Sequence, residues 1–89
     1  MSKAYIVLQD NEESRYIVEA IEEDNPDATV IHQPAMIRVE NEGRLIIRRE
    51  TVEEKTGFDW DVQALHVNLV TICGNVDEDD DQFTLEWKE

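Results

Sequence analysis

The amino-acid sequence predicts a mixed α/β (α+β) fold: one compact domain over residues 1–89, built as a sandwich of two βαββ units. Three observations lead to this fold class. A chain of 89 residues has room for a single hydrophobic core. Residues 12–24 have the apolar spacing of an amphipathic helix. Short apolar or alternating runs before and after this segment have the pattern of β-strands.

The first unit starts with a strand and the amphipathic helix. Residues 5–9 are apolar on both faces, which predicts a central strand. The helix over residues 12–24 follows, with Asn11 as its N-cap, because an asparagine side chain accepts a hydrogen bond from the first helical turn. Pro26 disfavours a helical conformation at the residue before it and therefore ends the helix.

Two strands complete the first unit, over residues 28–33 and 36–41. The turn at residues 41–43 has the composition of a tight β-hairpin, with Gly43 in the positive-φ position. This turn leads into a fourth strand, over residues 44–49. We therefore expect the third and fourth strands to pair with each other.

The second unit repeats the order of elements. Thr51 and Glu54 have the spacing of a capping box, which predicts a short helix that ends at Gly57. Residues 65–72 are expected to form a strand with a bulge, because the inward-facing set changes along it, from Leu65, Val67 and Leu69 to Val70 and Ile72. Residues 74–82 read as an acidic loop. The alternation from Phe83 to Trp87 is typical of an edge strand.

The charge of the chain excludes several kinds of partner. Twenty-two acidic residues face 8 Lys and Arg, for a net charge of −14. This charge repels phosphate backbones and anionic lipids, so we expect binding to neither nucleic acid nor membranes. The single cysteine cannot form an intrachain disulfide, and no segment resembles a signal peptide or a membrane span. A cytoplasmic location is expected.

No motif for catalysis or cofactor binding is present in the sequence. His32, His66 and Cys73 are too few and too dispersed for a zinc site. The acidic run at residues 77–81 lacks the glycine and glutamate that an EF-hand loop requires. The three glycines are isolated, so no phosphate-binding loop is predicted. We expect a protein that is no enzyme on its own and that carries no metal or cofactor.

Several stretches of the chain resemble a known family. They are Asn11 to Pro26, Arg49 to Glu54, Trp60 to Gln63 and Gly74 to Asp80, in order and without a large gap. In these stretches the chain resembles the small regulatory (effector or coupling) proteins of bacterial soluble di-iron multicomponent monooxygenases, in particular those of the phenol hydroxylase type. That family has the compact α/β sandwich of two βαββ units.

The resemblance implies a cofactor-free stimulatory component that binds the di-iron hydroxylase. Binding would couple NADH-driven oxygen activation to the hydroxylation of phenol to catechol. Electrons would come from a separate reductase with FAD and an iron–sulfur centre, which is not expected to form a stable complex with this chain. The alternatives are a small enzyme and, first among them, an acidic inhibitor or DNA mimic. Arg residues interspersed among the acids weaken the mimic hypothesis.

Three segments are candidates for contact with a hydroxylase: the helix entry, the 66–75 segment and the acidic loop at 77–81, which could steer the chain toward a basic rim. The helix entry has polar side chains beyond those that capping uses, and the 66–75 segment has polar residues in a broken strand pattern, which often lies beside a functional surface. An amide in this segment is either buried, in which case it needs partners within the chain, or exposed at an interface, where it can supply hydrogen bonds to the partner. Capping and ordinary strand polarity are the simpler explanations. The candidate interface residues are Asn11, Ser14, Arg15, Asn68, Thr71, Gly74 and Asn75.

Overall fold

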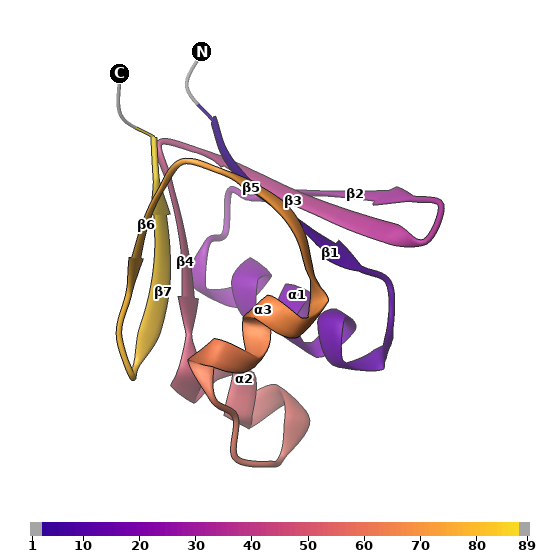
Figure 1. The fold of residues 1–89 in the computed structure, drawn as a ribbon, viewed down its shortest axis with the longest axis vertical. Helices are drawn as coiled ribbons and strands as arrows, with labels where there is room; N and C mark the ends of the chain where they lie inside the picture. The colour runs from indigo at the N-terminus through magenta and orange to yellow at the C-terminus, as the bar shows by residue number, and fades with distance from the viewer. Residues whose placement is uncertain (1–2, 88–89) are drawn as a thin grey trace.

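The computed structural model describes residues 3–87. The strands form two antiparallel sheets, with the strand orders β2-β3-β1-β5 and β4-β7-β6. In Figure 1 the two sheets meet at an angle, and the helices lie in the space between them. The predicted α+β fold class is confirmed. In chain order the elements are β1 (Lys3–Gln9), α1 (Glu12–Asp24), β2 (Thr29–Gln33), β3 (Met36–Glu42), β4 (Arg44–Arg48), α2 (Arg49–Thr56), the 3-10 helix η1 (Val62–Ala64), α3 (Leu65–Asn68), β5 (Leu69–Cys73), β6 (Asn75–Glu78) and β7 (Gln82–Glu86).

The first βαββ unit has the predicted order of elements. β1 lies between β3 and β5, so it is the central strand that its apolar sequence indicates. The Oδ1 of Asn11 accepts a hydrogen bond from the backbone N–H of Ser14 at 2.9 Å, which confirms Asn11 as the N-cap of α1. The helix ends at Asp24, before Pro26, as predicted.

The core lies where α1 packs against both sheets. Large apolar side chains from β1, α1, β3, β4 and β7 are completely or almost completely buried in it, and α3 adds Leu65. Because β1 and β4 belong to different sheets, this shared core holds the two sheets together. Its largest members are Ile6, Leu8, Ile17, Ile21, Ile37, Leu45, Ile47, Leu65, Phe83 and Leu85.

The predicted hairpin at residues 41–43 is wrong, although Gly43 does have a positive φ, of 77°. β3 already pairs with β1 on one edge and with β2 on the other, so it has no free edge for β4. β4 pairs with β7 in the second sheet. The turn therefore carries the chain from one sheet to the other. The carbonyl of Gly43 accepts a hydrogen bond from the backbone N–H of Trp87 at 2.8 Å.

The predicted capping box at Thr51 is also wrong, because β4 leads directly into α2 without a loop. Arg48, in extended conformation, is the N-cap and makes no side-chain capping bond. Thr51 lies within α2, and it is buried. The helix ends at Gly57, with φ of 78°, as predicted.

Only part of the predicted strand at residues 65–72 is a strand. Residues 65–68 form α3, and β5 begins at Leu69. The alternation of apolar residues fits a strand, and a single helical turn is too short to show a helical period. The predicted irregularity is confirmed, because the register between β1 and β5 shifts between Val7 and Leu8.

The predicted acidic loop at residues 74–82 contains the strand β6, which pairs with β7. β7 is therefore the middle strand of its sheet and not an edge strand. The acidic side chains of β6 suit its position at the sheet edge, since charges there prevent pairing with other chains. The second unit thus has one strand more than the predicted βαββ order.

Candidate docking surface

The structure brings two of the predicted interface segments together at the start of α1. The Nδ2 of Asn11 donates a hydrogen bond to the Oδ1 of Asn68 at 2.7 Å. The Nδ2 of Asn68 donates in turn to the Oε1 of Glu13 at 2.7 Å. These bonds join α1 to α3 across more than fifty residues of sequence. We call this place the α1–α3 junction, and it consists of Asn11, Glu13, Val67, Asn68 and Val70.

Asn68 is the bonded centre of the junction and not part of its surface. Its residue is only 5% exposed, so of the two alternatives the structure shows the buried amide. Both polar atoms of its amide are paired within the chain. A buried amide needs such partners, because an unpaired buried polar group is unfavourable. Asn68 therefore positions α3, and both polar atoms of its side chain are engaged within the chain.

Two of the exposed side chains at the junction are apolar and lie with the exposed Glu13. Val67 is 75% exposed and Val70 is 47% exposed, and they flank Asn68 in sequence. Exposed apolar side chains that lie together can mark a surface that another protein covers. The strand prediction placed Val67 on the inward face of the sheet. The turn of helix at α3 directs it outward, which is why the sequence pattern missed it.

A second contact holds α3 from the opposite side. The Nε2 of His66 lies 2.6 Å from the Oε1 of Glu78 on β6. The ring of His66 also makes an edge contact with Phe83 of β7, with 6.1 Å between the ring centroids. α3 is therefore fixed to α1 through Asn68 and to the second sheet through His66. Val67 lies between the two residues that make these contacts.

The remaining residues of the predicted interface differ in their exposure to solvent. Ser14 is fully buried, and its Oγ has no hydrogen-bond partner within residues 3–87, so it is not a surface residue. Arg15 is exposed, and its Nε lies 3.1 Å from the Oδ1 of Asp10. Thr71 is exposed on β5, opposite Val7 of β1.

Gly74 and Asn75 lie away from the junction, beyond the far end of β5. Five strand residues separate them from α3, a length of about 17 Å at 3.4 Å per residue. Asn75 is exposed and pairs in register with Glu86. A Cβ atom on Gly74 would lie 3.3 Å from the carbonyl oxygen of Glu86. Local packing therefore explains why position 74 is a glycine.

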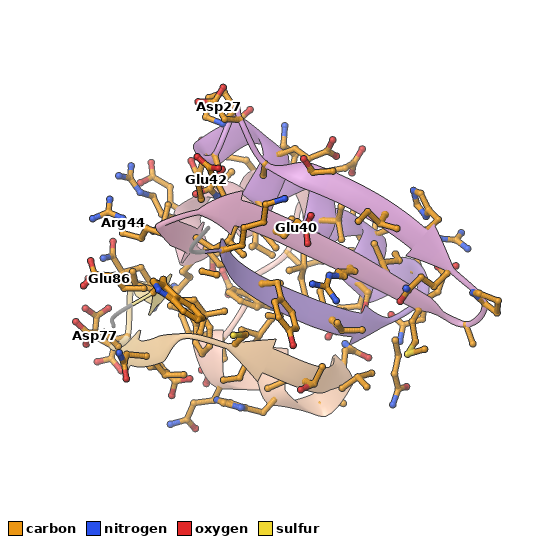
Figure 2. The ribbon with its side chains drawn as sticks, turned by 90° about the horizontal axis from the view of Figure 1, so that it is seen from above. Asp27, Glu40, Glu42, Arg44, Asp77 and Glu86 are labelled. Carbon is orange, nitrogen blue, oxygen red and sulfur yellow. The ribbon has the colours of Figure 1, made fainter. Side chains whose placement is uncertain are left out.

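Acidic groups dominate the electrostatics of the molecule. Figure 2 shows Arg44 among carboxylates at one end, those of Asp27, Glu42, Asp77 and Glu86. Glu40 lies on the outer face of the first sheet and has two cationic partners, Lys3 at 3.2 Å and Arg38 at 3.1 Å. The hydrogen bond from Lys3, with a smaller one from Arg38, lowers the pKa of Glu40 although burial opposes this shift.

The described part of the chain offers no metal centre. Within residues 3–87, no group of three or more His, Cys, Asp or Glu side chains is arranged to hold a metal ion. The two histidines lie on different elements, His32 on β2 and His66 on α3. No helix in these residues is both long enough and apolar enough to cross a membrane.

A small α+β fold that presents a rigid, partly apolar surface is typical of a protein-binding component. The model of the MmoB/DmpM family matches residues 2–86. The chain therefore belongs to the MmoB/DmpM family, which confirms the resemblance to the regulatory proteins of multicomponent monooxygenases. Membership of this family indicates a regulatory subunit and not a catalytic one.

Individual relatives agree with this assignment. The chain is 64% identical over 87 residues to the stimulatory component DmpM of phenol 2-monooxygenase from Pseudomonas sp. (strain CF600), covering 98% of this chain and 97% of that protein. A chain in a structure of a phenol hydroxylase–regulatory protein complex is 62% identical, with a TM-score of 0.92, over 97% of this chain and 99% of that one. The regulatory protein B of soluble methane monooxygenase shares the fold, with 17% identity and a TM-score of 0.76, over 97% of this chain and 65% of that one.

Proposed function

We propose that this chain is the stimulatory component of a multicomponent phenol hydroxylase and that it docks on the hydroxylase through the α1–α3 junction. The relative at 64% identity is a stimulatory component of phenol 2-monooxygenase, and the similar solved chain comes from a complex with phenol hydroxylase. The observation that carries the docking surface is the 75% exposure of Val67 on a helix held from both sides.

The energetic argument rests on rigidity. Covering Val67 would contribute about 1–2 kcal/mol from the burial of its side chain. This free energy adds fully to the affinity only if binding does not also have to order the helix, because ordering has an entropic cost. The bonds of Asn68 and His66 order α3 before the partner arrives. Arg15 and Thr71 are exposed and belong to the polar rim of the proposed surface, while Asn11 and Asn68 support it from inside.

The proposed role needs no cofactor on this chain, whose residues 1–89 act as a single regulatory domain in the cytoplasm. The hydroxylase would supply the di-iron centre, and a reductase with FAD and an iron–sulfur centre would deliver electrons from NADH without a stable complex with this chain. Docking would couple oxygen activation to the conversion of phenol to catechol. The purified chain is expected to retain no stoichiometric iron, zinc or calcium after dialysis.

The alternative of an acidic inhibitor or DNA mimic has less support. A mimic would have to present its carboxylates as a regular phosphate-like series. Several of them are paired with cations here, including Glu40 with Lys3 and Glu23 with Lys55. Family membership favours the regulatory role.

Reconstitution tests the proposed function. The chain would be added to purified phenol hydroxylase and its reductase, and the catechol formed would be measured against the NADH consumed. We expect the catechol formed per NADH consumed, and the rate of catechol formation, to rise with the concentration of the chain until they saturate. No rise in either quantity at any concentration, with a folded protein and an active hydroxylase, would contradict the proposal.

A further inference from the structure

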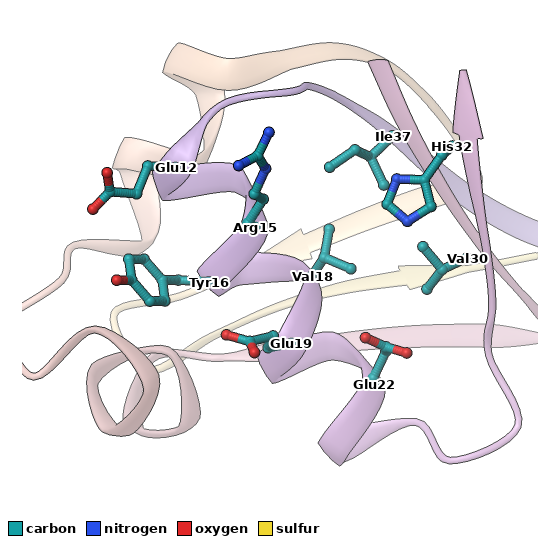
Figure 3. A pocket seen from close by; sticks show the side chains of 9 residues that line it. All are labelled: Glu12, Arg15, Tyr16, Val18, Glu19, Glu22, Val30, His32 and Ile37. Carbon is teal, nitrogen blue, oxygen red and sulfur yellow. The ribbon is translucent and has the colours of Figure 1, made fainter. Parts of the chain in front are cut away.

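A groove runs between α1 and β2 and extends along the helix from Glu12 and Arg15, near the α1–α3 junction, to Glu22. Figure 3 shows Val30 and His32 pointing from β2 toward the helix, with Val18 pointing from α1 toward the strand. The groove has a volume of about 390 Å³. Its lining is apolar at the base and polar along the helix, and consists of Glu12, Arg15, Tyr16, Val18, Glu19, Glu22, Val30, His32 and Ile37.

The rim of this groove carries three carboxylates without a salt-bridge partner in the described part of the chain, although Lys55 interacts electrostatically with one of them, Glu19. Glu12, Glu19 and Glu22 are exposed, and none of the three carboxylates forms a salt bridge or side-chain hydrogen bond within residues 3–87. The one arginine of the rim, Arg15, is already bound to Asp10. Like charges three residues apart on a helix repel each other, so a cation from outside would relieve Glu19 and Glu22.

The strand that forms the other wall has a free edge. β2 is the end strand of its sheet, so half of its backbone N–H and C=O groups face away from β3. Natural edge strands are usually protected by charged residues or proline. The five residues of β2, Thr-Val-Ile-His-Gln, include no proline, lysine, arginine, aspartate or glutamate. An extended peptide can therefore add to this edge as a further strand.

We propose that an extended, basic segment of the hydroxylase pairs with β2 and fills the groove above α1. Its backbone would bond to the free edge of β2. Its apolar side chains would cover Val18 and Val30, and its Lys or Arg side chains would reach Glu19 and Glu22. Charge complementarity identifies the occupant, because the rim is acidic and the whole chain carries −14. This inference rests on the proposed function and adds a second contact outside the α1–α3 junction.

Charge reversal at the rim tests the ionic half of the proposal. The double variant Glu19→Lys/Glu22→Lys is compared with Glu50→Lys/Glu54→Lys, which makes the same charge change at exposed positions of α2. We expect the first variant to bind the hydroxylase about tenfold more weakly at low salt, and the difference to shrink at high salt, where ion pairs are screened. The α2 variant should lose much less affinity. Equal losses for the two variants would show only a general charge effect and would overturn the proposal.

Hydrogen exchange of the unmodified protein tests the strand pairing without depending on any variant. The outward-facing backbone amides of β2 should exchange more slowly in the complex with the hydroxylase than in the free chain. A complex that forms and stimulates turnover while β2 exchanges at an unchanged rate would overturn this inference and leave the proposed function intact. Absence of any complex or stimulation would instead remove the proposed function itself.

Discussion

The side chain of Asn25 occupies the place of a neighbouring strand beside Ile46. Its Oδ1 accepts a hydrogen bond from the backbone N–H of Ile46 at 3.0 Å, and its Nδ2 donates to the carbonyl of Ile46 at 2.7 Å. The same Nδ2 donates to the carbonyl of Ile21 at 2.8 Å. Asn25 therefore caps the C-terminus of α1 and the open edge of β4 at once, and this contact ties the helix to the second sheet.

Replacing Asn25 with alanine should destabilise the protein by about 2–4 kcal/mol, because the substitution leaves buried backbone groups of Ile46 without partners. Urea or thermal unfolding followed by circular dichroism measures the change. Asn41→Ala is the matched control, since its single bond to the carbonyl of Arg44 is exposed. Equal stability of the two variants would mean that the Asn25 contacts with β4 contribute nothing.

The bond between Asn11 and Asn68 should appear as a coupling energy in a double-mutant cycle. Asn11→Ser retains a capping oxygen but loses the amide that reaches Asn68, and Asn68→Ala removes the other partner. The two substitutions together should destabilise less than the sum of the single changes, by about 0.5–1.5 kcal/mol. Additive effects in urea unfolding would show that the two elements are not joined by this bond.

The contribution of Glu40 to the free energy of unfolding depends on pH. Its folded-state pKa lies below its ordinary value, chiefly because Lys3 donates a hydrogen bond to it. A carboxyl group with a depressed pKa stabilises the fold above its unfolded pKa of about 4.3, and this stabilisation is lost as the pH falls through the folded pKa. Glu40→Gln should therefore lower the free energy of unfolding at pH 7 and have less effect well below pH 4. The comparison is made from urea curves across this range. A difference between the two proteins that does not change with pH would be inconsistent with this role.

How far the sequence predicts the structure depends on how local the information is. α1 was predicted to the residue, because the Asn11 cap, the helical period and Pro26 are all neighbours in the chain. α3 was missed, because one turn of helix has no recognisable period. The strand β6 was missed because its acidic residues resemble a loop. No local signal indicates that the Gly43 turn crosses between sheets, since the answer depends on which strand edges are already occupied.

The candidate surface was predicted in part for the same reason. Helix entry and segment 66–75 were identified separately, but their contact through Asn11 and Asn68 links residues 57 positions apart. Pairwise contact at that range cannot be read from a single sequence. The exposure of Val67 followed only from the helical conformation of α3, which the alternating pattern hid.

The affinity of the hydroxylase for Val67→Asp tests the docking surface most directly. Val76→Asp is the matched control, because it makes the same change at an exposed valine on β6, away from the α1–α3 junction. Isothermal titration of both variants and of the unmodified protein, with melting temperatures checked, gives the comparison. We predict that Val67→Asp binds about 10- to 100-fold more weakly while Val76→Asp binds like the unmodified protein. Equal affinity of all three proteins would contradict docking through the α1–α3 junction.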